Sequence, residues 1–215
     1  DRNGRIHSLD LAGDAVEVRT DLRIPTQGWK KLPNLDTVKN AKSSEADGKR
    51  TWAGRIEAEP GQAFRYEETL REEAGAVHLA LRVVAESDAK IEGVYFWLDL
   101  PVAVFGGGAA DLSDGAETKS APMPPEKPAS RHFLAATASK ASFAAPTGKP
   151  TLDVTLNPPC PVSVQDNRER NTPTYSALVR FPVAQWTKGT AATLDVTLRL
   201  AGQADQSPAN LTLDT

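Results

Sequence analysis

The stretch Thr193-Leu-Asp-Val-Thr-Leu-Arg-Leu200 alternates apolar and polar side chains with a period of two. Successive side chains of a β-strand point to opposite faces, so the aliphatic residues share one face and the polar residues share the other. This alternation predicts a strand of an antiparallel sheet with one face in the core and one face in water. The same period recurs, more weakly in places, at 5–11, 15–24, 77–83 and 151–156.

Residues 91–105 have a different pattern, because they are nearly continuously apolar and aromatic. A run of this kind is typical of a strand covered on both faces, or of the central strand of a sandwich. Pro101 is expected to bend or end this strand, since proline has no backbone N–H to donate to a neighbouring strand.

The rest of the chain contains further short strands separated by turn residues such as Glu59-Pro60-Gly61. No window of a dozen residues carries a capped helical stripe, and the best helical candidates are short pieces near 36–43 and 182–186. About a dozen strands at such spacing predict an all-β fold, an antiparallel β-sandwich with little helix. The additional strands are expected at 51–58, 63–71, 131–137, 139–144, 162–165 and 174–181.

The domain organisation follows from the length of 215 residues and the similar strand patterns along the chain. A sandwich of this size often folds as one unit. We interpret residues 1–215 as a single β-sandwich domain with two long loops. One loop, 30–50, is polar and charged, and the other, 106–130, is rich in glycine and proline.

Composition excludes several classes of function. The net charge is −3, with 25 basic and 28 acidic residues, so a nucleic-acid partner is not expected. No stretch approaches 18 consecutive apolar residues, so no membrane span is expected. The single cysteine, Cys160, excludes an intrachain disulfide and a multi-cysteine metal site. The first residue is Asp1, without a signal sequence, which favours a processed chain or a piece of a longer polypeptide with neighbouring domains as partners.

Cofactor motifs are absent, including the P-loop, the dinucleotide fingerprint and the zinc-protease helix. The glycine-rich run at 106–115 contains two aspartates but matches neither an EF-hand loop nor a stack of calcium-binding repeats. No cofactor is therefore expected, with one open alternative. That alternative is a single structural calcium ion held by Asp111 or Asp114.

The aromatic residues give the clearest candidate for a ligand site. Alternation places Tyr95, Trp97 and Asp99 on one face of their strand. Two aromatic rings and a carboxylate can stack against the apolar face of a sugar and bond its hydroxyl groups. The alternative is that this face packs under a second layer, with Asp99 bonded to a backbone amide.

Two further sets of residues are candidates for ligand contact. Trp29, Trp52 and Trp186 follow loop or turn signals, where a large aromatic side chain can contact a ligand or close the end of a sandwich. Asp166 and Arg168 stand where a strand enters a polar turn, and together they offer acceptors and a planar guanidinium. The alternative is an Asx-turn in which Arg168 bridges to a loop.

The order of these motifs resembles the accessory, carbohydrate-binding-module-like β-sandwich domains of secreted bacterial polysaccharide-active enzymes. The resemblance implies a polysaccharide or oligosaccharide ligand, no catalytic residues within the domain, and a secreted, cell-surface or periplasmic location. The motifs that carry it are Trp52 with Gly54, the run from Gly93 to Pro101 leading to Gly106-Gly107, Gln165 to Arg168, and a last strand after Trp186 and Gly189.

The leading hypothesis is therefore a non-catalytic carbohydrate-binding or accessory module. One alternative is a glycoside hydrolase or polysaccharide lyase on a sandwich scaffold, which needs two carboxylates, or a base with Arg168, on one concave face. Another alternative is a structural or assembly module of a cell-surface protein, which the strand-like ends at 5–11 and 210–213 leave open.

Overall fold

A computed structural model describes residues 3–11, 14–39 and 41–201. The predicted all-β, antiparallel fold is confirmed, and helix is limited to α1 (Val102–Phe105) and three short 3-10 turns, η1 (Gln27–Trp29), η2 (Leu35–Thr37) and η3 (Arg168–Arg170). The strands are β1 (Leu9–Leu11), β2 (Asp14–Val16), β3 (Arg19–Arg23), β4 (Lys42–Ala46), β5 (Lys49–Glu59), β6 (Gln62–Glu73), β7 (Ala76–Ala85), β8 (Tyr95–Pro101), β9 (Ala109–Ser113), β10 (Thr118–Pro122), β11 (His132–Ala144), β12 (Thr151–Asp166), β13 (Thr174–Arg180) and β14 (Ala191–Ala201).

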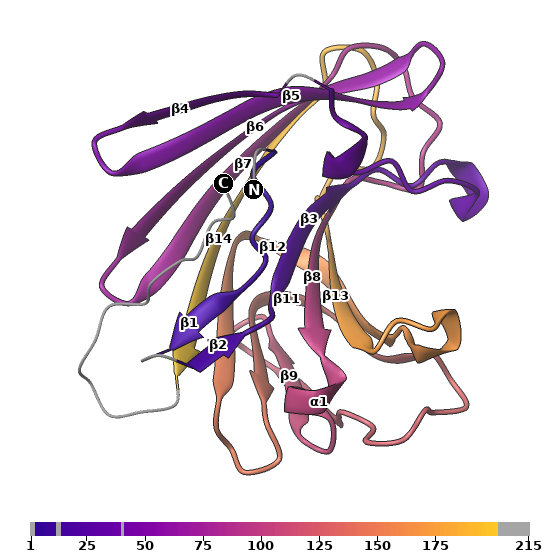
Figure 1. Cartoon of the computed structure of the whole chain (residues 1–215). Helices are drawn as coiled ribbons and strands as arrows, with labels where there is room; N and C mark the ends of the chain where they lie inside the picture. The colour runs from indigo at the N-terminus through magenta and orange to yellow at the C-terminus, as the bar shows by residue number, and fades with distance from the viewer. Residues whose placement is uncertain (1–2, 12–13, 40, 202–215) are drawn as a thin grey trace.

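The strands form two layers (Figure 1). The first layer has the order β10-β9-β11-β12-β14-β7-β6-β5-β4. The second layer continues from the other half of β12 in the order β13-β8-β3. Every pairing among the described strands is antiparallel, and β1 and β2 form a separate small hairpin. The alternating pattern of 193–200 thus lies in β14, near the middle of the first layer.

Strand β12 belongs to both layers, and its prolines mark the change of partner. Residues 151–157 pair with β14, whereas residues 162–166 pair with β13. Pro158 and Pro159 stand between these two segments and have no N–H to donate. The pairing with β11 also shifts register here, between Ala138 and Lys140. The strands expected at 151–156 and 162–165 are therefore two halves of one strand that passes from one layer to the other.

The core lies between the layers and is built from the aliphatic and aromatic face of each strand. In β14 the residues that enter this core are those predicted from the alternation. In β8 they are Phe96, Leu98 and Leu100. They belong to one contiguous cluster that includes side chains from both layers, such as Phe64 of β6 and Tyr175 of β13. Burial of this apolar surface is the main force holding the layers together.

Several expected boundaries differ from the structure. The stretches 131–137 and 139–144 form one strand, β11, with a bulge. The stretch 30–50, expected to be a loop, contains β4, and the stretch 106–130 contains the hairpin of β9 and β10. The run 91–105 contains β8 and then turns at Pro101 into α1. The strand-like end expected at 210–213 lies outside the described residues.

No helix in the described part of the chain is long and apolar enough to cross a membrane.

Strand β6 carries a carboxyl group into the core. Glu68 is 2% exposed, pairs in register with Trp52 and Leu81, and its Oε1 has no hydrogen-bond partner among the described residues. Burial penalises the charged form and raises the pKa of Glu68 to about 8. The neighbouring Glu67 points to the outer, exposed face, as alternation requires.

This buried carboxyl group predicts a specific pH dependence of stability. Between the ordinary pKa of 4.5 and the folded pKa of about 8, the folded chain binds the proton more strongly than the unfolded chain. The free energy of unfolding should therefore fall as pH rises through this window, by up to about 1.4 kcal/mol per pH unit. Glu68→Gln should flatten the dependence, whereas the exposed control Glu67→Gln should not. Denaturant unfolding from pH 5 to 9 measures both, and equal slopes for Glu68→Gln and the unmodified chain would contradict the assignment.

Candidate functional site

The outer face of the second layer, on the side away from the core, carries the aromatic and acidic residues expected on β8. Phe96 and Leu98 point into the core, so Tyr95, Trp97 and Asp99 point to the outer face. Trp97 is only 3% exposed, yet it is not part of the core cluster. The guanidinium of Arg23 covers its ring, at 4.2 Å from the ring centroid. The structure thus places Trp97 under Arg23 and not open to solvent.

Neighbouring strands align polar residues beside Asp99. Antiparallel register brings residues on five adjacent strands into one row across the sheet, with strands about 4.8 Å apart. The row, in strand order, contains Arg19, Asp99, Ser176, Gln165 and His132. The sequence distances between these residues are large, so the fold and not a local motif assembles the row.

Asp99 has two carboxylate oxygens with different surroundings. Its Oδ1 accepts hydrogen bonds from Trp97 Nε1, at 2.9 Å, and from the hydroxyl of Ser176. None of the hydrogen bonds among the described residues uses Oδ2, which lies 3.5 Å from Arg23 Nη2. The side chain is 18% exposed. One oxygen is therefore held by hydrogen bonds, and the other is held among the described residues by the ion pair with Arg23.

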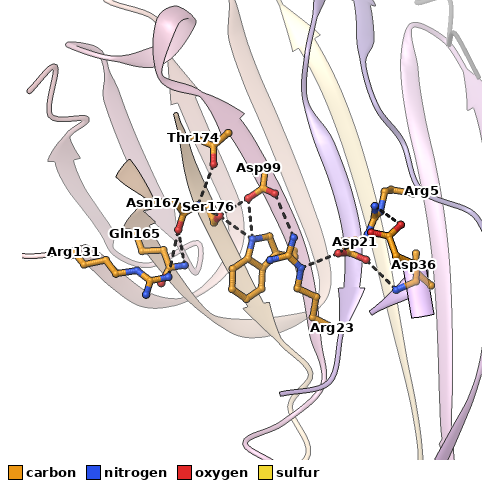
Figure 2. Close-up of polar contacts among 12 residues, drawn as sticks. Arg5, Asp21, Arg23, Asp36, Asp99, Arg131, Gln165, Asn167, Thr174 and Ser176 are labelled. Atoms are coloured by element: carbon orange, nitrogen blue, oxygen red, sulfur yellow. Dashed lines mark hydrogen bonds and ion pairs between the residues drawn. The ribbon is translucent and has the colours of Figure 1, made fainter. Parts of the chain in front are cut away.

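Ion pairs on the β3 side hold Arg23 in place (Figure 2). Asp21 Oδ2 accepts from Arg23 Nε at 2.8 Å and lies 2.9 Å from Arg5 Nη2. Arg5 Nη1 also lies 2.6 Å from Asp36 Oδ1. Burial acts to lower the pKa of Arg5, but Asp21 and Asp36 outweigh it and raise that pKa. This charged network orients Arg23 over Trp97 and toward Asp99.

Amide side chains support the other side of Asp99, as Figure 2 shows. Asn167 Nδ2 donates to Ser176 Oγ at 2.5 Å and to Thr174 Oγ1 at 3.1 Å. Asn167 Oδ1 accepts from Gln165 Nε2 at 3.0 Å and from Arg131 Nη2 at 3.3 Å. These buried groups satisfy one another, which makes the face rigid and polar.

A shallow hollow of about 350 Å³ lies on the same outer face, in the rows next to Asp99. Leu178 is the register partner of Trp97, and Ser163 is the register partner of Leu178. Arg180 stands at the edge, opposite Tyr95. An apolar floor with a few polar groups at its rim is the usual composition of a small-molecule site. We call this the sheet hollow; its lining residues are Tyr95, Ala135, Ala136, Pro161, Val162, Ser163, Leu178 and Arg180.

Asp166 and Arg168, at the end of β12, hold the proline-rich segment after β10. Arg168 Nη1 donates to the carbonyl of Pro125 at 2.6 Å, and its Nη2 donates to the carbonyls of Pro124 and Glu126, both at 2.8 Å. Its guanidinium also bonds both carboxylate oxygens of Asp166. The structure therefore gives this pair the bridging role that was the alternative to ligand binding.

Burial acts to raise the pKa of Asp166, but the hydrogen bonds from the Arg168 side chain and backbone hold that pKa below its ordinary value. The carboxylate is 2% exposed and depends on this one guanidinium.

The other predicted contact residues lie away from this face. Trp52 and Trp186 are 3% and 4% exposed and belong to the core cluster. Trp186 packs edge-on against Phe64, with 5.7 Å between ring centroids. Their rings thus stabilise the core, and ligand contact by either one stays a prediction.

The two aspartates proposed for calcium occupy the β9–β10 hairpin. Asp114 Oδ1 accepts from the backbone N–H groups of Ala116 and Glu117, both at 2.9 Å, and so shapes the turn. These hydrogen bonds lower its pKa. Asp111 lies on β9, opposite Ser142 and Ser120. Within residues 3–11, 14–39 and 41–201, no three His, Cys, Asp or Glu side chains are grouped to hold a metal ion. A calcium ion at this hairpin stays a prediction.

Comparison with known proteins places the fold. No known protein family matches the sequence, and no curated protein matches it. The structure is similar to a galactose mutarotase-like protein from Lactobacillus casei, with 12% identity and a TM-score of 0.59, over 94% of this chain and 95% of that one. It is also similar to the GalM/aldose epimerase homologue from C. elegans, with 9% identity and a TM-score of 0.54, over 94% and 81%.

A third similar structure is a galactose mutarotase related enzyme from Lactobacillus acidophilus, with 10% identity and a TM-score of 0.51, over 96% and 89% of the two chains. The chain therefore has an all-β, mutarotase-like fold. The carbohydrate part of the resemblance drawn from the sequence is supported. The prediction of a non-catalytic accessory module is wrong, because the three structures that share this fold are described as mutarotase-like, as an aldose epimerase homologue and as a mutarotase related enzyme.

Sequence reasoning missed most partners of Asp99. Alternation along 174–180 places Ser176, Leu178 and Arg180 on one face, but it does not say which strand lies beside them. The sequence around Arg23 does not indicate its role, because Arg23 reaches Trp97 and Asp99 only when β3 pairs with β8. The missing information was strand order.

The Arg168 bridge predicts a stability effect. Arg168→Gln removes the only guanidinium bonded to the buried Asp166 among the described residues, so we expect the free energy of unfolding to fall by about 3 kcal/mol at pH 7. Because the pKa of Asp166 is lower in the folded chain, its ionised carboxylate stabilises the fold at any pH above its unfolded pKa of about 3.9. This stabilisation is lost as the pH falls through the folded pKa. The difference between variant and parent should therefore shrink below about pH 4.

Chemical denaturation at pH 7 and pH 3 measures this difference. The matched control is Arg170→Gln on the same 3-10 turn, where the exposed side chain should change stability by less than about 0.5 kcal/mol. An Arg168→Gln variant as stable as the control would show that the bridge does not hold the segment.

Proposed function

We propose that this chain binds a reducing sugar over the sheet hollow and catalyses the interconversion of its two anomers, with Asp99 as the general base. The observation that carries this proposal is the Asp99 carboxylate, which is fixed through Oδ1, has no hydrogen bond at Oδ2 among the described residues, and stands one row from Leu178 of the hollow. Two proteins that share the fold are described as a galactose mutarotase-like protein and an aldose epimerase homologue, and these descriptions support the same reaction class.

The sheet hollow suits one face of a pyranose ring. Its floor of Leu178, Ala135 and Pro161 is apolar and matches the C–H face of a sugar. Its rim offers the Ser163 hydroxyl, the Tyr95 phenol and the Arg180 guanidinium to sugar hydroxyl groups. Burial raises the pKa of Tyr95, so the phenol keeps its proton and can donate it in a hydrogen bond at neutral pH.

The reaction needs one proton removed and one added at the anomeric centre. Asp99 Oδ2 takes the proton of the anomeric hydroxyl, the C1–O1 bond becomes a carbonyl, and the bond from C1 to the ring oxygen breaks. The ring oxygen takes a proton from a water molecule in the hollow, and the hydroxide left there takes that proton back when the ring closes. Rotation about C1–C2 presents the other face of the aldehyde, and the reverse steps close the ring as the other anomer.

Arg23 and Ser176 act as positioning residues in this scheme. Ser176 donates to Oδ1 and accepts from Trp97 and Asn167, so it fixes the plane of the carboxylate. Arg23 places a positive charge 3.5 Å from Oδ2. A fixed base within reach of its proton is the geometric requirement of general base catalysis.

The test is the rate of anomer conversion by polarimetry or proton NMR, started from pure α-anomers of glucose, galactose, xylose and maltose. The unmodified chain should accelerate at least one of them above the buffer rate, and Asp99→Asn should lower kcat/KM about 100-fold or more. The side chain of asparagine keeps an acceptor for Trp97, so the fold should persist in circular dichroism. Asp195→Asn, an exposed carboxylate on the outer face of β14, is the matched control and should retain full activity.

Two outcomes would overturn the proposal. One is an unmodified chain that accelerates none of the four sugars. The other is an Asp99→Asn variant as active as Asp195→Asn. Secretion and the presence of neighbouring domains, expected from the sequence, stay proposals beside this one.

A further inference from the structure

Trp29 is a large aromatic side chain held out in solvent. It is 41% exposed, and no other large hydrophobic side chain among the described residues is exposed. Its backbone φ is 57°, in the left-handed region. A bulky residue rarely adopts this conformation, because it costs free energy on folding. Neither its exposure nor its backbone conformation stabilises the hydrophobic core, so packing does not explain a tryptophan at this position.

Hydrogen bonds hold the Trp29 turn in a fixed shape. Trp29 N donates to the carbonyl of Thr26 at 2.9 Å, and Thr26 N donates to the carbonyl of Lys31 at 3.1 Å. A segment distant in sequence also holds the turn: Gly28 N donates to Glu92 Oε1 at 2.6 Å. Lys31 N also donates to Thr26 Oγ1 at 3.1 Å. The turn η1 is thus tied to the segment that leads into β8.

The Trp29 ring extends the sheet hollow. It packs against Tyr95 with 5.4 Å between centroids and 49° between planes, and Tyr95 lines the hollow. Gly93 makes room for this arrangement, because a Cβ there would lie 2.9 Å from Arg180 Nε and 3.2 Å from Tyr95 Cε2. The two rings therefore form an aromatic rim at one end of the hollow.

A second hollow of about 660 Å³ continues beyond this rim at the end of the sandwich. Arg180 lines both hollows. Among the described residues, Arg180 Nε and Trp186 Nε1 are buried N–H groups without a hydrogen-bond partner, and Trp186 as a whole is 4% exposed. Both groups are donors and both belong to the lining, so they suit a ligand rich in acceptor oxygens. We call this the end hollow; the lining residues used here are Gln27, Gln62, Glu92, Arg180 and Trp186.

We infer that the substrate is an oligosaccharide and not a free monosaccharide, with Trp29 as the stacking platform for the second sugar ring. This inference rests on the proposed function, which places the reducing-end sugar over the sheet hollow. The next ring stacks on Trp29, and later rings reach the end hollow, where Trp186 Nε1 and Arg180 Nε bond their hydroxyl oxygens. A rigid exposed aromatic ring fits the apolar face of a pyranose at little entropic cost.

The test is isothermal titration calorimetry of the full chain with glucose and with maltotetraose, cellotetraose and xylotetraose. At least one tetrasaccharide should bind more tightly than glucose, and Trp29→Ala should weaken that tetrasaccharide about tenfold without changing the affinity for glucose. Trp29→Phe should restore most of the loss. Because Trp29 is exposed, the melting temperature of Trp29→Ala should stay within about 2 °C of the parent.

Paired arginine variants test the path to the end hollow. Because Arg180 lines both hollows, Arg180→Ala should weaken the tetrasaccharide more than glucose, whereas Arg82→Ala, at an exposed arginine on the outer face of β7, should weaken neither. Binding of no sugar by the unmodified chain would overturn the proposed function and this inference together. Tetrasaccharide binding that Trp29→Ala leaves unchanged, or an equal loss for glucose and tetrasaccharide, would overturn this inference alone.

Discussion

The split pairing of β12 is the constraint on which the rest of the structure depends. One half of this strand pairs with β14 and the other half with β13, so one continuous strand belongs to both layers. The prolines between the halves cannot donate to either neighbour, which stops the pairing at that point. The core forms between the diverging layers, and β13, β8 and β3 follow in the second layer. The outer face of that second layer exists because β12 leaves the first.

The polar residues on that outer face form a network that is nearly as buried as the core. Ser176, Gln165 and Asp21 are each less than 5% exposed, although they lie on the side away from the core. Buried polar groups cost stability unless they are hydrogen-bonded, and here Ser176, Gln165 and Asp21 each bond a neighbour in the network. The result is a fixed carboxylate beside an apolar hollow. Such order is more than packing requires, which is why we place the function at this face.

The sequence predicted the class of fold and one face of the site, because both depend on local alternation. The period of two identified β14, β7 and the first half of β12, and it placed Tyr95, Trp97 and Asp99 together. It could not show that Arg23 would cover Trp97 or that Ser176 would bind Asp99, since these contacts depend on strand order. The sequence placed Trp29 after a turn signal, but it could not show that Trp29 alone of the tryptophans is exposed and packs against Tyr95. The carbohydrate ligand expected from the sequence stays a proposal, whereas the non-catalytic role is contradicted by the structures that share the fold.

The central claim is that sugar binds on the outer face of the second layer, between Asp99 and Trp29. Backbone amide chemical shifts, recorded while a reducing tetrasaccharide is titrated into the labelled chain, test it most directly. The account predicts that the largest changes fall on η1, on β8 near Tyr95 and on β13 near Arg180. Changes concentrated on the opposite side of the molecule, on the outer faces of β6, β7 and β14 around His78, would contradict it.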